Sequence, residues 1–89
     1  MLEVNKITGN KYRVIVKEKN NYSDHIVSIE PDYYQKLTEG KVSKDELLKQ
    51  AFEFLLAREP AGSILSKFDL KDINRFFPEF EEEIKKQLK

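Results

Sequence analysis

Side chains that could do catalysis or bind metal are scarce in this sequence, which has one histidine and no cysteine. His25 follows Asp24, but one histidine gives no metal-ligand spacing, and no GxSxG-like segment presents a serine nucleophile. We interpret His25 as a partly exposed strand residue. The three glycines are isolated and form no phosphate loop, and residues 81–83, all Glu, fit a solvated helix start. We therefore predict a protein that is not an enzyme and that uses no metal or cofactor.

A different kind of chemistry is offered by basic residues spaced two apart. Lys11, Arg13 and Lys17 occupy odd positions of one expected strand, so they share one face of it with Ile15. Residues 1–29 contain five Lys and Arg against three Asp and Glu, a balance of +2. Two interpretations stay open. The stripe is a solvated face that discourages edge pairing, or it is a weak surface for an anionic partner with Ile15 as its anchor.

Overall composition limits the classes of function. The chain has 89 residues, 36% of them charged, and 16 basic residues balance 16 acidic ones, unlike a globally basic nucleic-acid binder. This length suits one domain covering residues 1–89. No apolar run is long enough to span a bilayer, and the first ten residues lack the apolar core of a signal peptide. Because the absence of cysteine fits a reducing compartment, we expect a cytoplasmic protein that does not bind membranes.

Residues 1–30 predict an antiparallel meander of three strands. Gly9 and Asn10 suit a two-residue hairpin turn, because both tolerate a positive φ. The second strand covers residues 11–18, and a third, HIVSIE, covers residues 25–30 with β-branched side chains. The turn between them falls at residues 19–21.

Residues 31–89 predict three or four helices. Pro31 suits the first turn of a short helix over residues 32–38. Ser43 and Glu46 predict a capping box at the start of the strongest helix, whose apolar stripe includes Leu55. Asp69 is a plausible N-cap for a further helix that carries Leu70, Ile73, Phe76 and Phe77, and residues 79–89 predict the last. All six phenylalanines lie between Phe52 and Phe80, and we interpret them as core filling, with a ligand pocket as the alternative. We expect an α+β fold in which these helices pack on one face of the meander.

Residues 25–59, a short strand followed by two helices, resemble the ribbon-helix-helix family. In that family two chains pair their strands and the ribbon enters the DNA major groove. The resemblance implies a dimeric DNA-binding regulator of antitoxin type. The outward side chains of this strand would be Ile26, Ser28 and Glu30, and a carboxylate facing phosphates is unfavourable.

The segments FEFLLAREPAGSIL and FDLKDINRFFPEFEEEI resemble a family of small prokaryotic proteins to which no activity is assigned. This resemblance implies a prokaryotic origin and transfers no site residues. Taken together, the sequence favours a small non-enzymatic binding or regulatory module. Its partner is another protein or a second copy of the chain, and DNA binding is the alternative.

Overall fold

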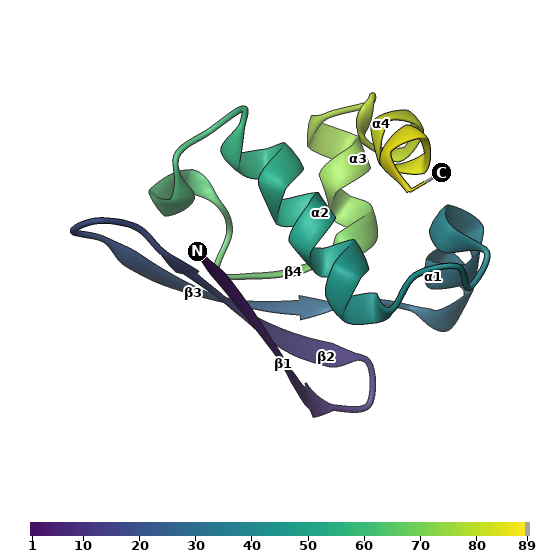
Figure 1. Cartoon of the computed structure of the whole chain (residues 1–89), viewed down its shortest axis with the longest axis horizontal. Coiled ribbons are helices and arrows are strands. Elements are labelled where there is room, and N and C mark those ends of the chain that lie inside the picture. Colours follow the sequence, from purple (N-terminus) through teal and green to yellow (C-terminus); the bar gives the residue numbers. More distant parts are fainter. Residues whose placement is uncertain (89) are drawn as a thin grey trace.

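The structure is a computed structural model that describes residues 1–88, and it confirms the α+β class (Figure 1). The order of elements is β1 (Leu2–Thr8), β2 (Lys11–Lys17), β3 (Tyr22–Ser28), α1 (Pro31–Thr38), α2 (Lys44–Leu56), η1 (Ala61–Ser63), β4 (Lys67–Asp69), η2 (Leu70–Asp72), α3 (Ile73–Phe76) and α4 (Phe80–Gln87). β1, β2 and β3 form the expected antiparallel meander. Gly9 lies in the β1–β2 turn with φ +53°, which explains the choice of glycine there.

Within residues 1–88 the predicted three-stranded meander is extended by a fourth strand, which was not expected. β4 lies in the half expected to be helical and pairs with β3 in parallel, with Val27 opposite Phe68. β3 also begins at Tyr22 and ends at Ser28, earlier than the expected 25–30. Its start is extended because Tyr22 is opposite Lys17 in the ladder with β2.

Side chains alternate across β2 as the sequence predicts. Tyr12, Val14 and Val16 are buried, whereas the intervening side chains are exposed or half-buried. In Figure 1 the helices lie to one side of the sheet, and α2 crosses it in contact with β1. The buried alternate face of the sheet therefore meets the apolar stripe of α2, in which Leu47, Phe52 and Leu55 are almost completely inaccessible.

Helix α2 begins where the sequence predicts but with a simpler cap. The Ser43 Oγ accepts a hydrogen bond from the backbone N–H of Glu46 at 3.1 Å. The Glu46 carboxylate does not return the bond, as a capping box would require, because it accepts instead from the Gln50 side chain at 3.0 Å. Half of the predicted capping box is therefore correct.

The segment after Asp69 is shorter and less buried than the expected helix. Asp69 does act as a cap, because its side chain accepts from the Lys71 N–H and Asp72 bonds back to the Asp69 N–H. The segment then forms one 3-10 turn and the four-residue α3 before Pro78. Leu70 and Ile73 are buried, but Phe76 is 66% exposed, so the expectation that the phenylalanines fill the core was wrong for Phe76. Since α3 is so short, it cannot turn both Phe76 and Phe77 toward the core.

The last helix, α4, rests on α1 and α2. Phe80 and Ile84 are fully buried, and the Phe80 ring meets Phe54 of α2 edge to face, with 5.1 Å between the ring centroids. Arg58 stacks on the Phe54 ring, 3.6 Å from its centre, and pairs with Glu79 at 3.3 Å. Within residues 1–88, no helix is long and apolar enough to cross a membrane.

Candidate functional site

The predicted basic stripe lies on the outward face of β2, but its charges are largely paired. Lys11, Arg13 and Lys17 are exposed and Ile15 is half-buried. The Arg13 Nε donates to both carboxylate oxygens of Asp24 on β3, at 3.0 and 2.9 Å. The Lys17 Nζ lies 2.8 Å from the Glu3 carboxylate on β1. Two of the three cations are thus matched by acids from neighbouring strands.

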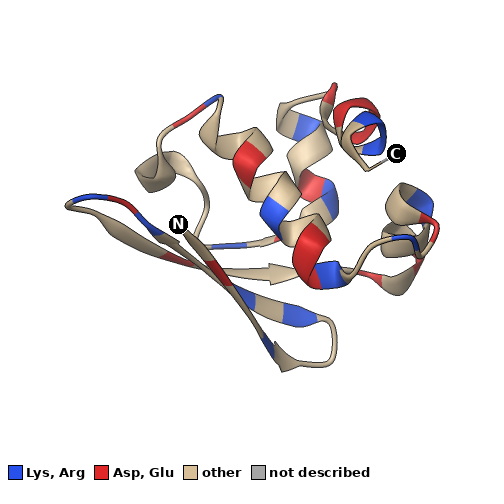
Figure 2. Ribbon diagram, viewed as in Figure 1, with Lys and Arg blue, Asp and Glu red and all other residues tan. Residues whose placement is uncertain are grey.

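The pairing of Arg13 with Asp24 also affects their protonation. The hydrogen bond from the guanidinium lowers the pKa of Asp24 below its ordinary value and raises the pKa of Arg13 above its own. Both groups therefore stay charged and matched at neutral pH. Figure 2 shows the same mixing on a larger scale, with basic and acidic residues interspersed along the ribbon.

Lys11 borders a small depression of about 220 Å³ between β2 and β4 that also includes Lys67 and Asp69. The Asp69 carboxylate accepts a hydrogen bond from the Ser28 hydroxyl at 2.9 Å. A bound anion would meet this carboxylate as well as the two lysines. The depression is therefore poorly suited to phosphate, and the outward face of the sheet offers little that attracts a polyanion.

His25 is a core residue, so the expectation of partial exposure was wrong. Its side chain is 2% exposed and packs on Phe52, with 5.4 Å between ring centres. The Nδ1 atom lies 2.7 Å from the Leu65 carbonyl oxygen, and Nε2 lies 2.9 Å from the Ser23 Oγ. Because a carbonyl can only accept, Nδ1 carries the proton and donates it to Leu65. The ring thereby fixes the loop before β4 to the sheet.

An apolar cavity opens beside that loop, between the end of α2 and α3. Its volume is about 330 Å³. We call it the α2–α3 groove, and its apolar lining comprises Leu55, Ile64, Leu65, Phe68, Ile73, Phe76 and Phe77. The residues deepest in the structure, Leu55 and Ile73, are 3% exposed. Segments on either side of β4 thus supply the walls.

The rim of the groove exposes large apolar side chains to solvent. Leu65 is 55% exposed and Phe76 is 66% exposed. Within residues 1–88, only three other large apolar residues are exposed to a comparable degree, namely Met1, Ile7 and Tyr22, and none of them lines the groove. Leu65 and Phe76 therefore extend the apolar surface of the groove beyond the cavity itself.

Two carboxylates give the groove a negative side. Glu59 and Asp72 both line it. Asp72 is engaged, since it accepts from the Asp69 N–H at 3.2 Å and lies 3.9 Å from the Arg75 guanidinium. Glu59 is half-buried, and no basic residue among residues 1–88 forms an ion pair with it. The groove thus combines aromatic and aliphatic walls with an unmatched negative charge.

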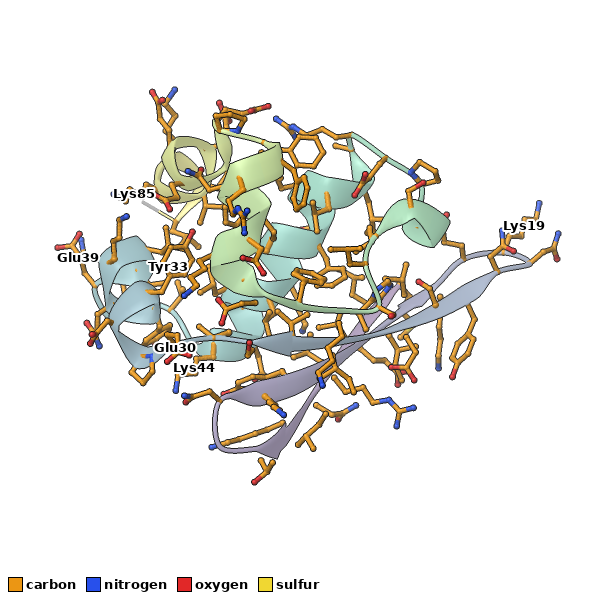
Figure 3. All side chains as sticks on the ribbon, turned by 180° about the vertical axis from the view of Figure 1, so that it is seen from behind. Lys19, Glu30, Tyr33, Glu39, Lys44 and Lys85 are labelled. Atoms are coloured by element: carbon orange, nitrogen blue, oxygen red, sulfur yellow. The ribbon has the colours of Figure 1, made fainter. Side chains whose placement is uncertain are left out.

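A third polar cluster, between α1 and α4, has a structural role. Tyr33 of α1 is labelled in Figure 3. Its hydroxyl donates to the Glu81 carboxylate at 2.9 Å. Lys36 pairs with the same carboxylate at 3.2 Å. Burial, together with the bond to Glu81, raises the pKa of Tyr33, so the phenol stays protonated. Every member has a partner within the cluster, which leaves no free group for a ligand.

Across residues 1–88, no three His, Asp or Glu side chains converge as a metal-binding group. No protein-family model, curated protein or solved structure matches the chain. The two family resemblances of the sequence therefore stay predictions, and the geometry of the groove carries the functional interpretation.

Because core filling was the preferred interpretation of the phenylalanines, the groove was not predicted, although one signal in the sequence indicated it. Phe76 and Phe77 are adjacent and lie between the cap at Asp69 and Pro78, so a regular amphipathic helix has little room there. Adjacent residues of a helix point about 100° apart, and a short helix cannot bury both. An exposed aromatic residue could therefore have been expected at this point.

Proposed function

We propose that the protein is a non-enzymatic binding module whose α2–α3 groove receives an apolar segment of a partner protein carrying a lysine or arginine. The observation that supports this most directly is the exposure of Leu65 and Phe76, which both line a cavity of about 330 Å³. Exposed aromatic and aliphatic side chains around a hollow are typical of interaction sites, because the protein gains free energy by covering them.

The shape of the groove favours a protein segment over a small molecule. A cavity of this volume is at the lower end of those that hold small ligands. A ligand confined to the cavity would leave the outer surfaces of Leu65 and Phe76 in water. A protein segment could place one or two apolar side chains in the cavity and cover the rims with its neighbouring residues, as interface cores do.

The charge of the groove favours a basic residue on that segment. The Glu59 carboxylate is half-buried without an ion-pair partner among residues 1–88, so an approaching acidic segment would be repelled. A lysine or arginine placed beside Glu59 would offset its charge while its aliphatic stem packs on the apolar wall.

The alternative of a ribbon-helix-helix DNA binder has less support. Such a dimer needs the strand before the first helix to pair with its own copy. β3 is paired with β2 along its whole length and with β4 over residues 26–28, so that part of it has no free edge. The outward charges of the sheet are also largely matched, as described above.

The absence of cysteine leads us to propose a cytoplasmic location as well.

A selection of random peptides displayed on phage tests the proposed function. Selected peptides should combine apolar residues with lysine or arginine and should bind the unmodified protein. Phe76→Ser should weaken their binding at least about tenfold, as removal of a central aromatic contact does. Tyr22→Ser is the matched control, because Tyr22 is 65% exposed but does not line the groove. Selected peptides that bind both variants equally well would refute the proposal.

A further inference from the structure

β1 forms one edge of the four-stranded sheet, and its outer edge faces no other strand of residues 1–88 (Figure 1). The direction of its backbone groups follows from two hydrogen bonds at its beginning. The Met1 nitrogen donates to the Lys17 carbonyl and the Lys17 N–H donates to the Met1 carbonyl, each at 2.8 Å. Such a mutual pair recurs at every second residue of an antiparallel ladder. Glu3 and Asn5 therefore also direct their backbone groups toward β2.

The alternate residues of β1 direct their N–H and C=O groups away from β2. Leu2, Val4 and Lys6 consequently present a row of unpaired donors and acceptors at the free edge. Their side chains lie on the helix-covered face of the sheet, where Leu2 and Val4 are only partly buried against the core. This edge offers both backbone hydrogen bonds and incompletely covered apolar side chains.

We propose that the edge is covered by the β1 strand of a second copy, paired antiparallel about a two-fold axis that passes beside Val4. In this register Val4 lies opposite its own copy, and Leu2 lies opposite Lys6 in both directions. All three residues with outward backbone groups then pair with one another. The Leu2 side chain lies against the aliphatic stem of the partner's Lys6, on the covered face.

The charges on the other face are compatible with this register. Glu3 lies opposite the partner's Asn5, so no like charges meet. A two-fold axis beside Glu3 would place the two Glu3 carboxylates opposite each other. An axis beside Lys6 would place two ammonium groups opposite each other. An axis beside Asn5 would use residues beyond Lys6, where the ladder with β2 is irregular between Lys6 and Thr8. An axis that passes between two neighbouring residues would place side chains from opposite faces of the sheet across from each other.

The opposite edge of the sheet explains why pairing would stop at two chains. β4 has only three residues, and the Asp69 N–H is already bonded to the Asp72 carboxylate. Short edges of this kind resist further strand addition. A two-fold pairing through β1 uses the one long free edge that residues 1–88 of each copy offer, so the assembly closes as a dimer.

Sedimentation velocity from low-micromolar to near-millimolar concentration tests this inference. The expected result is a reversible species of twice the 10.5 kDa chain mass. Two variants of the exposed Asn5 then test the register, and circular dichroism checks that both are folded. Asn5→Lys faces the partner's Glu3 and should tighten the dimer, whereas Asn5→Glu should weaken it. Each change acts twice across the axis, so we expect a shift of about two- to thirtyfold in the dissociation constant.

Effects within one chain run in the opposite direction and so cannot mimic this result. Asn5 is opposite Arg13 within the chain, so lysine there is unfavourable and glutamate favourable. Amide hydrogen exchange gives a second readout. Protection of Leu2, Val4 and Lys6 should rise with protein concentration, while that of Glu3 and Asn5 should not. A protein that stays monomeric throughout, or Asn5 variants that shift the dimer in the same direction, would overturn the proposal.

Discussion

Replacement of His25 by phenylalanine tests how the core supports the groove. The change keeps an aromatic ring against Phe52 but removes the Nδ1–H donor that bonds to the Leu65 carbonyl at 2.7 Å. Loss of this partly buried bond leaves the carbonyl without its donor and costs about 1–3 kcal/mol. For a domain of this size each 1 kcal/mol lowers the melting temperature by about 4–8 °C, so His25→Phe should melt about 4–24 °C lower.

Ser23→Ala is the matched control for this change. It removes only the hydroxyl beside Nε2, and Ser23 is half-buried, so water can replace the lost bond. We expect a cost of at most about 1 kcal/mol, clearly smaller than that of His25→Phe. Thermal unfolding followed by circular dichroism measures both variants. If His25→Phe melts at the same temperature as the unmodified protein, the bond to Leu65 does not hold the loop, and the reasoning fails.

Four further outcomes are expected. Ser43→Ala should lower the free energy of unfolding by about 0.5–2 kcal/mol, and an unchanged urea midpoint would show that the cap is dispensable. Leu55→Ala should cost about 2–5 kcal/mol, and a variant that unfolds like the unmodified protein would contradict the burial of this face. Phe76→Ser should lower the stability by no more than about 2 kcal/mol, because most of this side chain is already exposed, and denaturant titration measures it. Because Arg13 lowers the pKa of Asp24, the stability from this pair is present above the unfolded-state pKa and is lost as the pH falls through the lower folded-state value. Melting curves between pH 2 and 6 should therefore depend less on pH in Asp24→Asn, and identical pH profiles would refute the pairing.

Local patterns predicted much of this fold because they depend on neighbouring residues alone. The alternation along β2 predicted that Val14 lies on the buried face of the sheet, since successive strand side chains point to opposite faces. The Ser43 cap likewise follows from a residue and the helix directly after it. The turn at Gly9 needs only the backbone freedom of that glycine.

Features that depend on distant segments were not predicted. β4 has three residues and no alternation of its own, so only its parallel pairing with β3 makes it a strand. The burial of His25 depends on the same arrangement, since its ring partner is a carbonyl forty residues later in the chain. The pairing of Arg13 with Asp24 needs the register of β3, which the sequence placed too late. The candidate stripe was thus located correctly, but its neutralisation could not be foreseen.

The groove has walls from the end of α2, the loop before β4 and α3, so no single stretch of sequence contains its pattern.

The charge of Glu59 supports a matched test of its partner's chemistry. Replacing the basic residue of a selected peptide by glutamine should weaken its binding to the unmodified protein about two- to fivefold. The same replacement should have no effect on binding to Glu59→Gln. An equal loss with both proteins would show that Glu59 does not contact the basic residue.

Chemical-shift mapping of a selected peptide on the isotope-labelled protein tests the central claim most directly. Titration of the peptide should move the backbone amide signals of Leu65, Phe68 and Phe76, which surround the α2–α3 groove. The signals of Arg13 and Ile15, on the outward face of the sheet, should stay in place. Shifts confined to the outward face, with the groove signals unchanged, would contradict the assignment of the groove as the binding site.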